Sequence, residues 1–227
     1  MISFKGAHYP KSVILYAVYF YVRFAVSYRD LEEIMAERGV DVDHAKLNQW
    51  VEKYSVAVAS EAHCRKASTG RSWRMDETYI KVKGQWTYLY RAIDKCSNTL
   101  DFMLSERRDE AAATAFFAKV IASNGWPDKV VIDKSGSNAA GLFNMNCLLV
   151  MHNWCWLIEV LQVKYLNNII EQDHRFIKKT TRPMQTFKSF NSAAATLAGI
   201  EVAHMIRKGQ LDRPGLSGFE QFAEFAG

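Results

Sequence analysis

The order of the segments that follow residue 72 restricts the fold more than any other feature of this sequence. From there the apolar pattern changes, and β-branched and aromatic residues dominate. The pattern predicts strands at 72–82, 85–93 and 99–107, a helix at 109–124 and a strand at 129–133. The last strand, KVVID, is continuously apolar, as in strands that are buried on both faces of a sheet. We therefore expect an antiparallel meander to which a crossover helix adds a parallel strand, and this fourth strand can lie beside the first.

Two acidic residues are out of place in these strands. Asp76 lies within RMDETYIKV and Asp133 ends KVVID, although carboxylates are disfavoured inside apolar strands. A fourth strand beside the first would bring Asp133 close to Asp76. A third acidic residue, Glu171, opens a helical stretch that carries Lys178 on the same face two turns later. Carboxylates brought together from strands and a helix can hold two divalent cations, which is a common device for cutting and rejoining phosphodiester bonds.

Each of these acidic residues also has an ordinary structural interpretation. Asp133 could cap the turn at Ser135-Gly136. Glu171 could form a capping box with Asn168 and a surface ion pair with Arg175. The structural interpretation is weakest for the carboxylate in the middle of the first strand, because β-propensity argues against it. The residues alone leave both interpretations open.

The first sixty residues predict three helices. Their ranges are 12–25, 27–39 and 43–54. Ser27 with Asp30 resembles a capping box, Gly39 ends the second helix and Asp43 can cap the third. Helix, glycine turn and helix form the helix-turn-helix pattern, whose second helix enters the major groove of DNA. The outward positions that could contact bases or phosphates are His44, Lys46, Asn48, Gln49 and Lys53. Any amphipathic αα-hairpin has the same pattern, and the balanced charge of residues 1–60 does not favour DNA, so both interpretations stay open.

Composition is compatible with a nucleic-acid partner. The 227 residues are 49% apolar, which is enough for one core and a small satellite domain. The net charge is +5 and the pI is about 8.9. Basic residues exceed acidic ones in 61–95 and 161–190, around the first and third acidic positions discussed above. A polyanion would need positive charge in these places.

The cysteines and the apolar N-terminal run predict a cytoplasmic protein without zinc. Cys64, Cys96, Cys147 and Cys155 form no CxxC pair and have no histidine at zinc-finger spacing, so we expect reduced thiols. Residues 12–22 are apolar but too short to span a bilayer, and no signal-peptide cleavage site follows them. We therefore expect neither secretion nor a membrane partner.

The C-terminal part predicts one long helix and a tail. Residues 189–209 are rich in alanine and end in Arg207, Lys208 and Gly209, which suit a helix C-terminus. The small residues of this helix suit close packing, which we expect to be on the sheet. The tail, 211–227, predicts a loop with a short amphipathic turn, and we assign no function to it.

The sequence resembles the DDE transposases of bacterial insertion sequences, in particular the insertion-sequence-six family. The resemblance rests on RSWRMDETYIKVKG, YLYRAIDK, VVIDKSGSN, VKYLNNIIEQDHRFIKK and GIEVAHMIRKGQL. It implies that Asp76, Asp133 and Glu171 are the catalytic, metal-binding triad and that Lys178 is the basic residue two turns after the glutamate. It also implies an α/β fold, in which a ribonuclease-H-like catalytic domain with a mixed sheet and flanking helices follows an all-α helix-turn-helix domain. The corresponding ranges are 1–60 for the helix-turn-helix domain, 61–71 for a linker, 72–210 for the catalytic domain and 211–227 for the tail.

The resemblance further implies a function. The protein would bind the terminal inverted repeats of its own element and catalyse strand cleavage and replicative, cointegrate-type strand transfer. It would use two Mg²⁺ ions, which Mn²⁺ could replace, while Arg175 and Lys178 contact phosphates of double-stranded DNA at the element ends and the target. Pairing two ends requires at least a homodimer. Two rival classes are a helix-turn-helix regulator without catalytic activity and a ribonuclease-H-like nuclease that does not join strands. The chain departs from the family in the apolar segment 141–160, in the weakly basic segment 55–68 and at Gln49.

Overall fold

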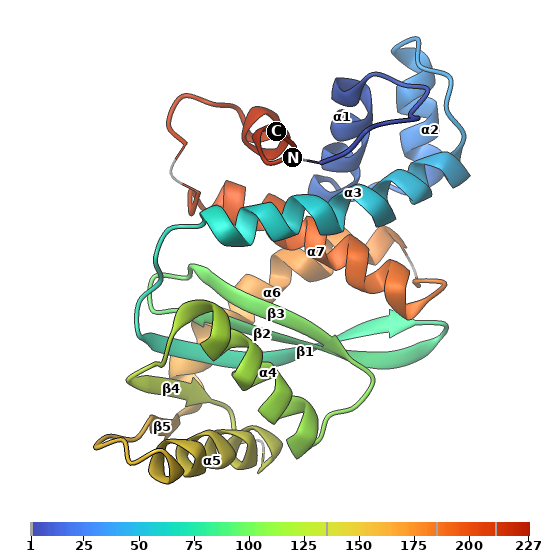
Figure 1. The fold of residues 1–227 in the computed structure, drawn as a ribbon. Helices are drawn as coiled ribbons and strands as arrows, with labels where there is room; N and C mark the ends of the chain where they lie inside the picture. Colours follow the sequence, from blue (N-terminus) through green and yellow to red (C-terminus); the bar gives the residue numbers. More distant parts are fainter. Residues whose placement is uncertain (1, 135, 185, 212) are drawn as a thin grey trace. The chain divides into compact units, whose positions relative to one another are not determined.

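The chain forms two compact units. The computed structural model describes residues 2–134, 136–184, 186–211 and 213–227 (Figure 1). One unit is Ser68–Arg175, and the other consists of Met1–Ala67 together with Phe176–Gly227. Helix α6, Asn168–Thr181, passes from the first of these units into the second. The domain boundaries given above at residues 60, 71 and 210 remain a prediction.

The unit Ser68–Arg175 is built on a five-stranded mixed sheet with the order β3-β2-β1-β4-β5 (Figure 1). Its strands are β1 Ser72–Val82, β2 Gln85–Asp94, β3 Thr99–Ser105, β4 Lys129–Ile132 and β5 Glu159–Gln162. The first three strands are antiparallel, whereas β4 pairs in parallel with β1, and β5 pairs in parallel with β4. The predicted meander with a parallel strand beside the first is therefore confirmed. The arrangement is the ribonuclease-H-like sheet that the resemblance implies.

Two helices, α4 Glu110–Asn124 and α5 Gly136–Met151, share one apolar core with this sheet. The sheet and the helices contribute Trp73, Met75, Tyr90, Val130, Phe116, Phe117, Leu142 and Met145 to it, all at most 3% exposed. The two helices approach closely at Gly141, where an added Cβ would lie 3.0 Å from the Ala113 Cβ. A larger residue there would require the helices to shift by a few tenths of an ångström, so the close packing favours glycine.

Helix α5 was not expected from the sequence. Its 16 residues contain no charged side chain, and the apolar residues show no amphipathic period. The inner side supplies core residues, but the outer side exposes Phe143, Val150 and Met151, at 67%, 59% and 76%. A helix that is apolar on both sides lacks the one-sided pattern by which helices are recognised in sequences.

The other unit is helical in the part of the chain that the structure describes. Its helices are α1 Lys11–Arg23, α2 Tyr28–Glu37, α3 His44–Arg65, the end of α6, α7 Phe190–Arg207 and α8 Gly218–Glu224. The three expected N-terminal helices are confirmed, and so are the capping box of Ser27 with Asp30 and the cap at Asp43. Helix α3 continues to Arg65 because buried residues such as Val58 extend its apolar face. No helix within the described ranges is long and apolar enough to cross a membrane.

The alanine-rich helix α7 is buried along most of its length. At Gly199 an added Cβ would lie 2.7 Å from both the Ser55 Oγ of α3 and the Val22 Cγ1 of α1. The close approach that we expected against the sheet is therefore made to α1 and α3. Small residues on a helix indicate that another element comes close, but they do not identify that element.

Candidate active site

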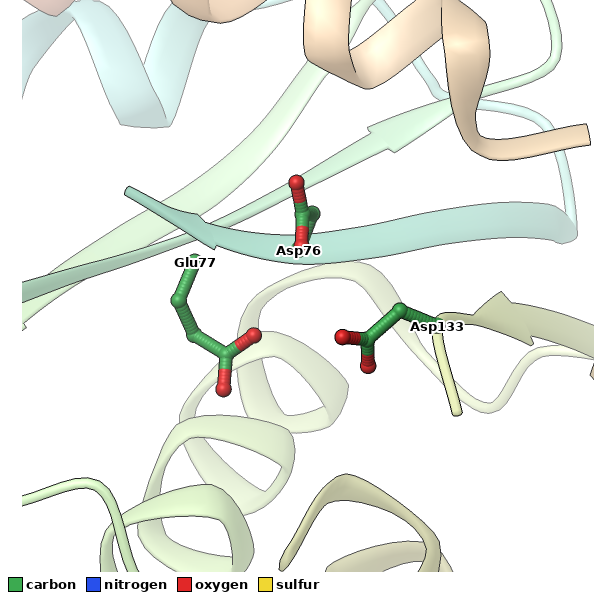
Figure 2. A group of neighbouring side chains, drawn as sticks. All are labelled: Asp76, Glu77 and Asp133. Carbon is green, nitrogen blue, oxygen red and sulfur yellow. The ribbon is translucent and has the colours of Figure 1, made fainter. Parts of the chain in front are cut away.

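Asp76 and Asp133 lie side by side because β1 and β4 are parallel neighbours. The last paired residues of these strands are Arg74 and Val131, and the two aspartates follow two positions later on each chain segment. Asp76, Glu77 and Asp133 each contribute a carboxylate oxygen to a group in which all three atoms lie within 4.8 Å of one another. Figure 2 shows Glu77 and Asp133 pointing toward each other. The expected approach of Asp133 to Asp76 is thus found in the structure.

Glu77 is the third member of this acidic cluster, and the sequence did not point to it. Its side chain is 3% exposed, compared with 17% for Asp76 and 37% for Asp133. Its carboxylate accepts hydrogen bonds from Arg108 Nε at 3.2 Å and from Asn138 Nδ2 at 3.1 Å. Because neighbouring strand residues face opposite sides, Glu77 was not expected beside Asp76. The sequence feature that could have identified Glu77 is that it is a second carboxylate, next to Asp76, in the same apolar run.

The surroundings of Glu77 change the pKa of its carboxyl group. Burial raises the pKa of its carboxyl above the ordinary value and Asp76 adds to this, while Asn138 and Arg108 act in the opposite direction. Both donors also reach Asp133, with Arg108 at 3.5 Å and the Asn138 amide at 3.5 Å. Glu77 is thus buried and hydrogen-bonded, whereas the carboxylates of Asp76 and Asp133 remain partly open to a ligand.

The first turns of α6 are tied to β1 and β2 by polar contacts. Arg91 of β2 pairs with Asp173 at 2.7 Å, and the two side chains are only 1% and 7% exposed. His174, which is also buried, places its Nε2 3.3 Å from the Asp76 Oδ2. These contacts fix the beginning of α6, and with it the backbone that carries Glu171.

Glu171 itself is exposed, and among the described residues it is not part of the acidic cluster. The capping-box interpretation is wrong, because Asn168 has helical backbone angles (φ −55°, ψ −30°) and so cannot be the cap. No ion pair joins Glu171 to Arg175 within the part of the chain that the structure covers. Arg175 and Lys178 are exposed on the same helix. The turn-capping alternative for Asp133 involves Ser135, which lies outside the described residues.

The residues predicted to contact the terminal repeats are all on α3, in its first two and a half turns. His44, Gln49 and Lys53 are exposed, while Lys46 and Asn48 are half-buried. The His44 ring lies 3.0 Å from a Glu32 carboxylate oxygen of α2, and the Asn48 amide donates to Glu52 at 3.3 Å. The segment therefore presents polar groups on its outer side, and their role in DNA recognition stays a prediction.

Comparison with known proteins identifies the class. Residues 70–210 match a family model described as a DDE domain. The chain is 40% identical over 206 residues to the transposase for insertion sequence-like element IS431mec of Staphylococcus aureus strain Mu50, which covers 90% of this chain and 88% of that protein. Identity and coverage are the same for the transposase for insertion sequence element IS257 in transposon Tn4003 of Staphylococcus aureus. The protein is thus a DDE transposase, an enzyme that cuts DNA and transfers its strands. It belongs to the insertion-sequence-six family.

Solved structures show more distant similarity. A chain of the simian T-cell lymphotropic virus intasome in complex with PP2A regulatory subunit B56 gamma aligns with a TM-score of 0.48 and 16% identity. The alignment covers 67% of this chain and 58% of the viral one, so this chain spans little more than half of it. For the HTLV-2 integrase catalytic core domain in complex with magnesium (trimeric form), the TM-score is 0.39 at 13% identity, with 71% and 86% covered.

Proposed function

We propose that this transposase binds the terminal inverted repeats of its own insertion sequence and joins them replicatively to target DNA, through a cointegrate. The observation that carries the proposal is that Asp76, in the middle of β1, and Asp133, directly after β4, bring carboxylate oxygens within 4.8 Å of each other. Two partly open carboxylates this close together can hold the divalent cations that assist phosphoryl transfer. We assign catalysis to Asp76, Asp133, Glu171 and Lys178.

The donor set fits a hard divalent cation such as Mg²⁺, with Mn²⁺ able to replace it. Carboxylate oxygens are the ligands that Mg²⁺ prefers, and the cluster offers them within 4.8 Å of one another. When bound, a metal pair would stabilise the negative charge that develops on the attacking and leaving oxygens of a phosphodiester. Asp76 and Asp133 would hold the metal, and Glu171 would complete the ligand set from α6.

The neighbouring side chains would orient these ligands and the DNA. His174 Nε2 lies 3.3 Å from Asp76 Oδ2, close enough for a protonated imidazole to form an ion pair with this carboxylate. Arg175 and Lys178 are exposed on the helix that carries Glu171, where they can contact backbone phosphates and hold the scissile bond in line. His44, Lys46, Asn48, Gln49 and Lys53 would contact the terminal repeats, with α2 and α3 acting as the helix-turn-helix. Because two ends must be paired, the active species would be at least a dimer, acting on DNA in the bacterial cytoplasm.

One assay separates this function from its two rivals. The full-length protein is incubated with Mg²⁺, a duplex that carries the element's own end and a supercoiled target plasmid. The proposed function predicts cleavage at the end followed by covalent joining to the plasmid. Cleaved but unjoined ends would instead identify a nuclease, and binding without cleavage would identify a regulator.

A further inference from the structure

Asn138 connects the buried and the open parts of the acidic cluster. It lies in the first turn of α5, and its side chain is fully buried. Its Nδ2 donates to Glu77 Oε2 at 3.1 Å and approaches Asp133 Oδ1 at 3.5 Å. One amide group thus bridges the carboxylate of Glu77 in β1 and that of Asp133, which directly follows β4. A neutral donor in that position lowers the repulsion between the carboxylates without adding a charge.

Asp133 needs such support because it lies beyond the end of its strand. β4 ends at Ile132, so the sheet ladder no longer fixes the residue that follows. The Asp133 side chain is 37% exposed, whereas Glu77 is 3% exposed. Glu77 is therefore well held, and Asn138 connects it to Asp133. Arg108 also connects them, at 3.2 Å from Glu77 and 3.5 Å from Asp133.

We propose that Asn138 is a positioning residue that holds the Asp133 carboxylate toward Asp76 by tying it to the buried Glu77. Glu77 then serves as the anchor of this frame and not as a metal ligand, because both of its oxygens already accept hydrogen bonds. The inference rests on the proposed function, in which Asp133 binds a divalent cation. Hydrogen-bonded partners of metal-binding carboxylates fix their orientation and so raise the metal affinity.

The test is the affinity of the full-length, DNA-free protein for Mn²⁺, followed by the electron paramagnetic resonance of the free ion. Asn138→Ala removes the bridging donor and, because asparagine is neutral, adds or removes no formal charge at that position. Asn146→Ala is the matched control: it lies on the same helix and also loses two hydrogen bonds, to the backbone of Ile158 at 3.1 and 2.8 Å. Asn138→Leu is a second variant that keeps the buried volume, and thermal unfolding of each variant is recorded alongside.

We expect Asn138→Ala and Asn138→Leu to weaken Mn²⁺ binding about tenfold, while Asn146→Ala binds Mn²⁺ as the parent does even if its melting temperature falls as much. Unchanged or tighter binding in the Asn138 variants would overturn the inference, and so would equal weakening in Asn146→Ala. A parent protein that binds no more Mn²⁺ than Asp76→Asn would overturn the proposed metal site itself. If instead the parent binds Mn²⁺ and Asn138→Ala binds it equally well, the metal site stands and only the role of Asn138 is overturned.

Discussion

At the end of β2 the Asp94 side chain accepts hydrogen bonds from the backbone N–H groups of Gly70, Cys96 and Asn98, at 3.0, 2.8 and 2.9 Å. The side-chain amide of Asn98 adds a fourth, at 3.0 Å. Burial raises the pKa of Asp94, but the hydrogen bonds from Gly70, Asn98 and Cys96 outweigh it and hold the pKa below its ordinary 3.8. One ionised carboxylate thereby fixes the turn between β2 and β3 and the entry to β1.

The lowered pKa of Asp94 predicts how stability depends on pH. The folded protein binds the proton more weakly than the unfolded chain, so the stabilisation is complete above pH 3.8 and is lost as the pH falls through the folded value. Asp94→Ala should lower the free energy of unfolding by about 2–3 kcal/mol at pH 7, because the hydrogen bonds to a charged group are removed. Urea unfolding at pH 7 and pH 3 measures this. The exposed Asp128, paired with Arg71, gives the control Asp128→Ala, which should cost under about 0.5 kcal/mol. If Asp94→Ala lowers the free energy of unfolding as much at pH 3 as at pH 7, the stabilisation does not come from an ionised Asp94 with a lowered pKa.

At the scale of single elements, the buried pair of Arg91 and Asp173 holds the start of α6 on the sheet. Arg91→Met should reduce the free energy of unfolding by about 3–5 kcal/mol, because it leaves the Asp173 charge buried without this partner. The double variant Arg91→Met/Asp173→Leu should regain a large part of that stability, since no such charge remains. Chemical unfolding measures Arg91→Met, Asp173→Leu and the double variant, with Arg71→Met at an exposed ion pair as the control. If the double variant is as unstable as the sum of the single variants, the pair does not hold α6 in the way described.

The outer side of α3 gives a second prediction at this scale. Replacing Asn48 and Gln49 together by alanine should reduce the preference for the element's ends over random DNA. The expected reduction is about 1–3 kcal/mol for each base that the wild-type side chain recognises by two hydrogen bonds. Lys53→Ala should weaken binding to both kinds of DNA alike, because a phosphate contact carries no sequence information. Gel-shift titrations at one fixed salt concentration measure the ratio. An unchanged ratio in the double variant would leave α2 and α3 as an ordinary helical hairpin.

The elements differ in how far the sequence could predict them. Strands with turn signals were predictable: the hairpin turn at Lys83 and Gly84 has the two positive φ angles, 49° and 79°, that Asn/Gly-type turns adopt. The neighbourhood of Asp76 and Asp133 followed from the strand order alone. Helix α5 could not be recognised because it lacks a polar side, and the partner of Gly199 could not be recognised because a small residue does not specify what packs against it. Glu77 was missed because neighbouring residues of a strand face opposite sides, which places Glu77 away from Asp76. Asp133 lies just after β4, where its carboxylate comes close to those of both Asp76 and Glu77.

At the scale of the whole molecule, recognition and chemistry are assigned to different units. The predicted recognition residues of α3 belong to the unit that contains Met1–Ala67, whereas the acidic cluster belongs to Ser68–Arg175. Removal of a carboxylate from the cluster should therefore leave the binding surface for the element's ends unchanged. If the protein were instead a regulator, the parent would have no enzymatic activity, and removing a carboxylate could not abolish one.

The most direct measurement compares the parent protein with Asp76→Asn in an end-cleavage and strand-transfer assay, together with a gel shift on the same DNA. We expect the parent protein to cut and join DNA in Mg²⁺ and to stop in excess chelator. Asp76→Asn should bind the ends with unchanged affinity and give no cleaved product, because the substitution removes a metal ligand and leaves the DNA-contacting side chains in place. Cleavage that survives in Asp76→Asn, or cleavage by the parent in excess chelator, would contradict the central claim that these carboxylates and a divalent metal carry out the reaction.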